Sequence, residues 1–173
     1  MGKSMPVSEY LRRSFEPHCE YVDGELLPRQ PKDDECSSLF AALVGALSRR
    51  DRALGLRVRP SRHIRISPTR YRVPDVAVFL DSDPQVAATV APLFTVEIAS
   101  RSEAWSGVMG RISDHLAMGV GMAFVVDPHA RSVLAATPGQ SLHQLTPPLK
   151  VPIDIPNRGT LELDFDQIFA EMD

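Results

Sequence analysis

Lysine, cysteine and tryptophan are scarce in this chain of 173 residues. It has one tryptophan, two cysteines and three lysines, namely Lys3, Lys32 and Lys150. Cys19 and Cys36 lack the spacing of metal-binding pairs, so we expect two free thiols in a reducing compartment. No apolar run approaches the roughly 18 to 20 residues that cross a bilayer, and the N-terminal segment turns polar too early for a signal peptide. We therefore expect a cytoplasmic protein with no membrane segment.

The chain also lacks an overall excess of positive charge. Its formal net charge is -3 and its pI is about 5.9, which argues against a surface coated in positive charge for nucleic acid. Arginine is nevertheless concentrated, because nine of the 16 arginines lie between Arg49 and Arg72, with Asp51 the only acid among them. A guanidinium binds a phosphate through two parallel hydrogen bonds, so this segment suits a phosphate-bearing substrate. A solvated basic face would have the same composition.

The length and the hydrophobic fraction of 43% suit one core, so we expect a single domain over residues 1–173. Apolar spacing and capping residues predict helices at residues 9–15 after Ser8, at about 34–54 after Asp33 or Asp34, at 105–118 and at 164–171. The short Ala/Val-rich stretch after Pro84 is interpreted as one helical turn.

Strand signals occur between these helices. The pair Asp23-Gly24 predicts a hairpin turn near the N-terminus. After Gly55, apolar residues alternate with arginines, which is typical of strands with one basic face. Residues 73–79, 93–99 and 122–128 are apolar on both faces, as in central strands, and short strands follow from residue 132. The order strand, helix, strand over residues 93–128 predicts a crossover unit in an α/β fold.

Two acidic residues interrupt the apolar strands. Asp75 lies in the run VPDVAVF at residues 73–79, and Glu97 lies in LFTVEIA at residues 93–99. Burying an ionised carboxylate is costly unless a counter-charge or a metal compensates for the lost water. Two carboxylates on neighbouring strands therefore suggest a site for a divalent cation such as Mg²⁺ or Mn²⁺, which would orient a water and neutralise charge on a phosphoryl group. Taken alone, this pattern also arises by chance.

Four segments in a fixed order carry a resemblance to a known family. They are EYVDGEL at residues 20–26, RVPDVAV at 72–78, VEIAS at 96–100, and GV at 119–120 ahead of FVVDP at 124–128. In this order the chain resembles the Uma-two family of restriction endonucleases, a bacterial branch of the PD-(D/E)xK nuclease superfamily. The matching segments lie between residues 8 and 135.

The resemblance implies a restriction-endonuclease-like fold, with a mixed central β-sheet flanked by helices and an N-terminal hairpin. It implies that Asp75 and Glu97 hold Mg²⁺ or Mn²⁺, that Glu20 helps to place the metal or water, and that the protein hydrolyses DNA. Arginines between Arg57 and Arg72 would position the backbone. RNA is an alternative substrate with the same chemistry. Because two-fold symmetry suits cutting both strands of a duplex, we also expect a homodimer.

The chain departs from the family pattern at several positions. Ala99 stands where the superfamily usually has a lysine, and Arg111 stands where this family tends to place one on the following helix. Arg111 could stabilise a phosphoryl transition state, but it is a poor general base because a guanidinium stays protonated. No lysine lies within the matching segments, so we expect none in the site, and Cys36 replaces a common histidine. A second interpretation is therefore a catalytically degenerate protein that binds nucleic acid or protein.

Three further residues have two interpretations each. His115 lies one helical turn after Arg111, where a packed or surface histidine is favoured over a proton shuttle. Asp127 ends a buried strand, where capping of a turn is favoured over metal chemistry. Trp105 begins a helix, where packing in the core is favoured over stacking on a base.

Overall fold

The computed structural model describes residues 4–81 and 89–173. The helices are α1 (Val7–Tyr10), α2 (Asp34–Ser48), α3 (Asp51–Leu54), α4 (Trp105–Met118) and α5 (Phe165–Ala170). The strands are β1 (Cys19–Val22), β2 (Glu25–Pro28), β3 (Leu56–Pro60), β4 (Ile64–Ser67), β5 (Arg70–Arg72), β6 (Val76–Leu80), β7 (Phe94–Ile98), β8 (Met122–Asp127), β9 (Ser132–Thr137), β10 (Gln140–Gln144), β11 (Lys150–Ile155) and β12 (Gly159–Asp164).

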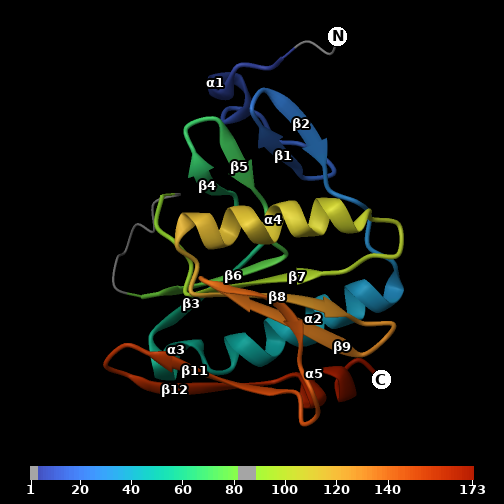
Figure 1. Ribbon diagram of the computed structural model, residues 1–173, viewed down its shortest axis with the longest axis vertical. Coiled ribbons are helices and arrows are strands. Elements are labelled where there is room, and N and C mark those ends of the chain that lie inside the picture. The colour runs from blue at the N-terminus through green and yellow to red at the C-terminus, as the bar shows by residue number, and fades with distance from the viewer. Residues whose placement is uncertain (1–3, 82–88) are drawn as a thin grey trace.

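A six-stranded mixed sheet in the order β10-β9-β8-β7-β6-β3 runs through the middle of the molecule (Figure 1). Among the described strands only β7 and β8 pair in parallel, and α4 connects them as the predicted crossover. A second sheet, β2-β1-β5-β4, lies beyond α4, and β11 and β12 form a separate hairpin near α5 (Figure 1). The expected mixed α/β fold is confirmed.

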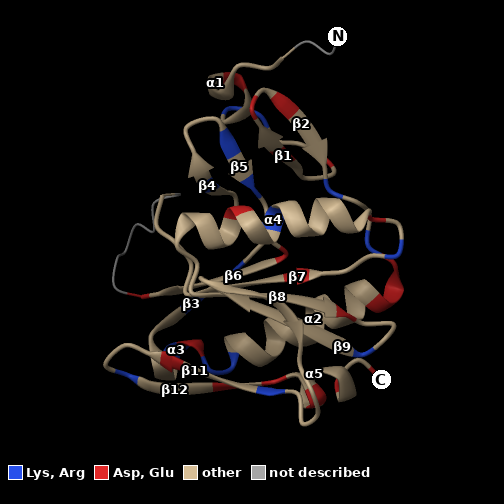
Figure 2. Cartoon of the chain, in the orientation of Figure 1, with Lys and Arg blue, Asp and Glu red and all other residues tan. Residues whose placement is uncertain are grey.

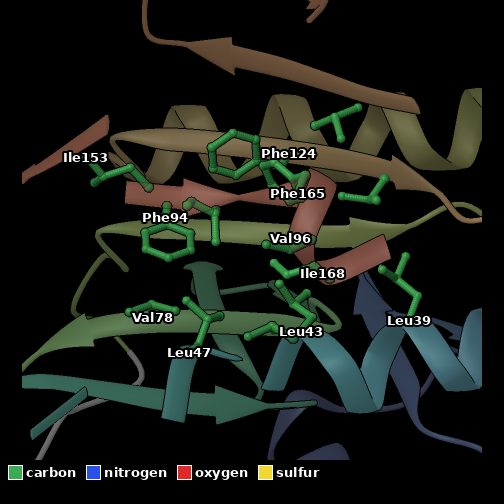
Figure 3. Packing of buried hydrophobic residues seen from close by; sticks show 14 of the residues in the cluster. Leu39, Leu43, Leu47, Val78, Phe94, Val96, Phe124, Ile153, Phe165 and Ile168 are labelled. Atoms are coloured by element: carbon green, nitrogen blue, oxygen red, sulfur yellow. The ribbon is translucent and has the colours of Figure 1, made fainter. Parts of the chain in front are cut away.

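Alternation along β7 divides its side chains between two environments. Phe94, Val96 and Ile98 belong to the main core, which they share with Leu39, Leu43 and Leu47 of α2. Figure 3 shows these α2 leucines packed against the strands, with Phe165 and Ile168 of α5 in the same core. Thr95 and Glu97 point to the opposite face, where α4 covers them. The polar side chains of β7 are therefore buried under a helix and not exposed to solvent.

The N-terminal helix is shorter than the sequence predicted. It covers Val7–Tyr10 with Pro6 as N-cap, so Ser8 lies inside the helix, and the expectation of a helix at residues 9–15 is wrong. Tyr10 is buried against Tyr21 and Tyr71, but residues 11–14 are exposed and have no apolar face to pack. Helices this short depend on tertiary packing, so the helix ends where burial ends.

The long helix is also divided. It ends at Ser48, and α3 follows after Arg49 and Arg50, in place of one helix to residue 54. Asp33 is confirmed as the N-cap, since the backbone N–H of Cys36 donates to Asp33 Oδ1 at 2.9 Å. At the C-terminus, Asp164 caps α5 by accepting from the N–H of Gln167 at 3.0 Å.

The turns follow the sequence closely. Asp23 and Gly24 both have positive φ, 50° and 100°, as a two-residue hairpin turn requires. Asp127 Oδ1 accepts from the N–H groups of His129 and Ala130, which confirms its capping role. The helical turn expected after Pro84 falls on residues 82–88, outside the described ranges. No helix in those ranges is long and apolar enough to cross a membrane.

Tyr10 couples the first helix to β1 and provides a test of this packing. Its hydroxyl donates to the Cys19 carbonyl at 2.9 Å, and burial, together with the charge of Glu20, raises the pKa of Tyr10 above its usual 10.0. Because the folded state favours the neutral phenol, Tyr10 contributes to the stability of the folded protein. This contribution is complete below pH 10 and is lost as the pH rises above 10.

We expect Tyr10→Phe to lower the free energy of unfolding by about 1 kcal/mol at pH 7, through loss of the hydrogen bond. The variant should also lose less stability than the native protein between pH 9 and about pH 11, where an unfolded tyrosine ionises. Urea denaturation followed by circular dichroism measures both quantities. Equal losses of stability in the two proteins would contradict the assignment to Tyr10.

Candidate functional site

Asp75 and Glu97 lie side by side at one end of two antiparallel strands. Val76 of β6 pairs with Val96 of β7, so the next position places Asp75 opposite Glu97. Both side chains are buried, and the backbone N–H of Ile98 donates to Asp75 Oδ2 at 2.6 Å. The structure thus brings together the two acids that the sequence singled out.

Arg111 enters this site from α4, as expected for a residue on the helix that covers β7. Its Nε donates to Glu97 Oε2 at 3.0 Å, and its Nη2 donates to Glu103 Oε2 at 2.8 Å. Burial would lower the pKa of Arg111, but Glu97 and Glu103 more than compensate and hold it above its usual value. Arg111 is therefore a fixed positive charge that is tied to both glutamates.

His115 lies one turn further along α4 and is completely buried. Its Nδ1 is 3.0 Å from Thr95 Oγ1, and its Nε2 is 3.7 Å from Glu97 Oε1. Burial and the charges of Arg111, Arg72 and Arg29 lower the pKa of His115 to about 3. The side chain is a neutral, packed histidine beside the site, in agreement with the favoured interpretation.

Glu20 reaches the same region from β1 in the smaller sheet. Its Oε2 accepts from Arg72 Nη1 at 2.8 Å, and its Oε1 accepts from the backbone N–H of Val73 at 3.0 Å. Arg72 also donates through Nε to Asp114 Oδ2 at 2.7 Å and is itself buried. The sequence predicted that Arg72 belongs to a basic face that binds phosphate. In the structure its guanidinium links Glu20 to Asp114 of α4, so it is not available to bind a substrate.

Sequence reasoning missed Arg29 and Lys32, which lie on the segment between β2 and α2. Arg29 Nη2 donates to Asp75 Oδ1 at 3.2 Å and to Glu97 Oε2 at 2.9 Å. Lys32 Nζ lies 2.7 Å from Asp75 Oδ1. The expectation that no lysine lies in the site is therefore wrong. The sequence offered one signal for Lys32, which directly precedes the N-cap of the longest helix. It did not indicate that this helix begins next to Asp75.

The two central carboxyls differ in their electrostatic setting. Burial would raise the pKa of Asp75, but the charges of Lys32 and Arg29 and the hydrogen bonds from Lys32 and Ile98 hold it below its usual range. Burial raises the pKa of Glu97, and the charges of Asp75 and Glu20 add to that effect, against Arg29 and Arg111. Neighbouring carboxyls whose pKa values move apart are typical of acid–base and metal sites.

The geometry also indicates which atoms could hold a cation. Asp75 Oδ1 and Glu97 Oε2 converge on one positively charged atom, Arg29 Nη2. Glu97 Oε1 is buried and has no hydrogen-bond partner among residues 4–81 and 89–173. Carboxylate oxygens are the ligands that Mg²⁺ and Mn²⁺ prefer, so this donor set fits such an ion. The guanidinium of Arg29 lies between the two carboxylates. A metal ion held by both carboxylates would need the same place, so Arg29 and the ion would exclude each other.

Charged residues from distant elements meet around this point. Figure 2 shows both signs of charge near the middle of α4, with basic colour along β5 and on the segment that follows β2.

Trp105 lies at the start of α4 and is 50% exposed, so the favoured interpretation of core packing is wrong. Cys19 and Cys36 are free thiols, as predicted, and both are buried.

Comparison with known proteins agrees with this description. The family model Uma2, described as "Putative restriction endonuclease", matches residues 7–164. A crystal structure of "a putative nuclease belonging to DUF820" from Anabaena variabilis superposes with a TM-score of 0.82 at 21% identity, covering 98% of this chain and 99% of that one. No curated protein matches the chain. Since the family model spans most of the sequence and the fold is that of the Anabaena protein, the chain belongs to the Uma2 family of restriction-endonuclease-like proteins.

Proposed function

We propose that this protein is a metal-dependent endonuclease that hydrolyses DNA phosphodiester bonds, with Mg²⁺ or Mn²⁺ held by Asp75 and Glu97. The observation that carries the proposal is the convergence of Asp75 Oδ1 and Glu97 Oε2 on one cationic nitrogen. When bound, a divalent ion there would polarise a phosphoryl oxygen and lower the pKa of an attacking water. Membership of the Uma2 family supports the nuclease assignment.

Lys32 is assigned the role that the superfamily gives to a lysine after the second acid. Its ammonium is 2.7 Å from Asp75 Oδ1, next to the point where the carboxylates meet. An ammonium at this place orients a water through its N–H donors and stabilises negative charge that develops on the phosphoryl group. The lysine that is missing at position 99 would thus be replaced by Lys32 from another segment of the chain.

Arg111 and Glu20 act mainly through the two carboxylates. Arg111 fixes Glu97 Oε2 and is itself held by Glu103, so it orients the glutamate and adds positive charge beside the reacting phosphate. Glu20 binds the N–H of Val73, two residues before Asp75, and so fixes the backbone that carries the aspartate. Both residues lie at the site, where Arg111 pairs with Glu97 and Glu20 lies 3.9 Å from Arg29, and Glu20 is proposed as a positioning residue.

Arg29 must leave the point between the carboxylates before a metal ion is held there. Arg29 lines a cavity together with Asp75 and Lys32, so a rotation of its side chain toward that cavity would free the carboxylates. A guanidinium placed there suits bidentate contact with a DNA phosphate. Arg29 is therefore the internal counter-ion of the two carboxylates, and with a metal ion bound there it would serve as a phosphate ligand.

The partners follow from the reaction. DNA is the proposed substrate, and a cytoplasmic homodimer is the proposed form, because a pair of sites related by two-fold symmetry cuts both strands. RNA cleavage would use the same residues and is separated from DNA cleavage by assay.

A second function is favoured by the ion pairs themselves. Arg29 and Lys32 neutralise Asp75, while Arg29 and Arg111 neutralise Glu97, without any metal. A site that satisfies its own charges in this way also suits a protein that keeps the fold and binds nucleic acid or protein without turnover. The two functions make opposite predictions for cleavage.

We expect the purified protein to cleave plasmid DNA in the presence of Mg²⁺ or Mn²⁺ and not in the presence of a chelator. Asp75→Asn, Glu97→Gln and Lys32→Met should each lower the rate by about 100-fold or more, because each removes a metal ligand or a group that acts in the transition state. Lys150→Met is the matched control, since Lys150 is a surface residue paired with Asp164.

Agarose gels with plasmid, single-stranded DNA and RNA report the substrate. Cleavage that survives both carboxylate substitutions would refute the site. If no nucleic acid is cut with either metal by a protein of native circular dichroism, the binding function replaces the enzymatic one.

Competition between Arg29 and the metal is tested by calorimetric titration with Mn²⁺. We expect Arg29→Ala to bind Mn²⁺ at least about tenfold more tightly than the native protein, a gain of about 1.4 kcal/mol, because the carboxylates no longer have to release a guanidinium. Arg158→Ala is the surface control. Binding that is unchanged or weaker in Arg29→Ala, or that persists when Asp75→Asn is added, would contradict the proposed place of the ion.

A further inference from the structure

Three potential ligands of a different chemical kind lie together at the start of α2. The atoms that Asp33, Cys36 and His129 offer, a carboxylate oxygen, a thiol sulfur and an imidazole nitrogen, all lie within 4.8 Å of one another. Asp33 is the N-cap of α2, Cys36 lies in the first turn of that helix, and His129 lies in the turn between β8 and β9. None of the three is among the residues assigned to the nuclease site.

The surrounding contacts hold these side chains in place. Asp33 Oδ1 accepts from the N–H of Cys36 at 2.9 Å, which leaves Oδ2 directed at His129 Nε2, also at 2.9 Å. The backbone N–H of His129 donates to Asp127 Oδ1 at 2.8 Å, so the turn that carries the histidine is fixed as well. Cys36 is completely buried, with its Sγ 3.4 Å from the Ala99 carbonyl oxygen.

We propose that Asp33, Cys36 and His129 form a Zn²⁺ site that fastens the start of α2 to the turn between β8 and β9. A thiolate, an imidazole and a carboxylate make a mixed sulfur, nitrogen and oxygen donor set, which suits Zn²⁺ and not the hard ions Mg²⁺ or Mn²⁺. Three protein ligands leave the fourth tetrahedral position to a water. The site is thus distinct in chemistry from the all-oxygen pair of Asp75 and Glu97.

The protonation states agree with metal-linked release of protons. Hydrogen bonds from Cys36 and the charge of His129 lower the pKa of Asp33 to about 2, so its carboxylate is ionised. Burial and the neighbouring Asp33 raise the pKa of the Cys36 thiol to about 12, so the metal-free thiol keeps its proton. Zinc binding requires the thiolate and therefore releases that proton.

The position of the site gives it a consequence for the rest of the molecule. Asp33 directly follows Lys32, which pairs with Asp75, and Arg29 lies on the same connecting segment. A zinc ion at Asp33 anchors that segment at one end and so restricts the movement of Arg29 and Lys32. Zinc would then adjust the nuclease site without binding to its carboxylates.

The proposal is tested by titrating the full-length protein with Co²⁺, which takes the place of Zn²⁺ and is visible by absorption. We expect one equivalent to give the charge-transfer band of a cobalt–thiolate bond, and Zn²⁺ to abolish it by displacement. The band should disappear in Cys36→Ser and persist in Cys19→Ser, which alters the other buried thiol. It should also persist in Asp75→Asn, so this test does not depend on the nuclease site.

Two variants on more accessible groups keep the test independent of core packing. We expect His129→Ala and Asp33→Asn to weaken Co²⁺ binding at least about 100-fold, since even outer contacts of a metal ligand are worth 10 to 100-fold. The overturning results are a spectrum without a thiolate band, a band that survives Cys36→Ser, or unchanged affinity in both of the other variants. Any of these would leave Asp33 as a helix cap that pairs with His129.

Discussion

The structure depends on the burial of two adjacent carboxylates between β6 and β7. Asp75 and Glu97 are 4% and 0% exposed, and neither can remain ionised there without nearby positive charge. Arg29, Lys32 and Arg111 supply it from two separate segments. The connection from β2 to α2 and the face that α4 presents to β7 are both arranged so that these cations reach the acids. The ion pairs of the site therefore also link the segment before α2 and the helix α4 to the central strands.

The same cations explain how a nuclease fold can lose its usual lysine and keep a lysine in the site. The position two residues after Glu97 is occupied by Ala99, whose N–H donates to the Val126 carbonyl of β8 at 2.9 Å. Lys32 contacts Asp75 from the segment between β2 and α2, and Arg111 contacts Glu97 from α4. Electrostatic stabilisation depends on where the positive charge lies, and not on which segment of the chain supplies it. In the proposed mechanism, the Lys32 ammonium and the Arg111 guanidinium together take the role of the superfamily's usual lysine.

The sequence predicted those parts of the structure that depend on local pattern. The apolar runs gave the central strands, Asp23-Gly24 gave the hairpin, and the acids within the runs gave Asp75 and Glu97 as neighbours. Helix ends were harder to predict from the sequence. Helix α1 ends at Tyr10, its last buried residue, although helical spacing continues beyond it. Arg29 and Lys32 were missed because their partners lie far along the chain and no short motif records that meeting. Trp105 was misplaced because helix position alone does not fix which face meets the core.

The sequence separations within the site have a consequence for how the chain folds. Arg29 meets Asp75 across 46 positions and Glu97 across 68, and Arg72 meets Glu20 across 52. Closing loops of this length costs entropy before any contact compensates for it, so non-local contacts form slowly and late. The N-terminal hairpin and the helices depend on local contacts, so we expect them to form before the acids lose their water. We therefore expect a newly made chain to acquire its charged centre late in folding.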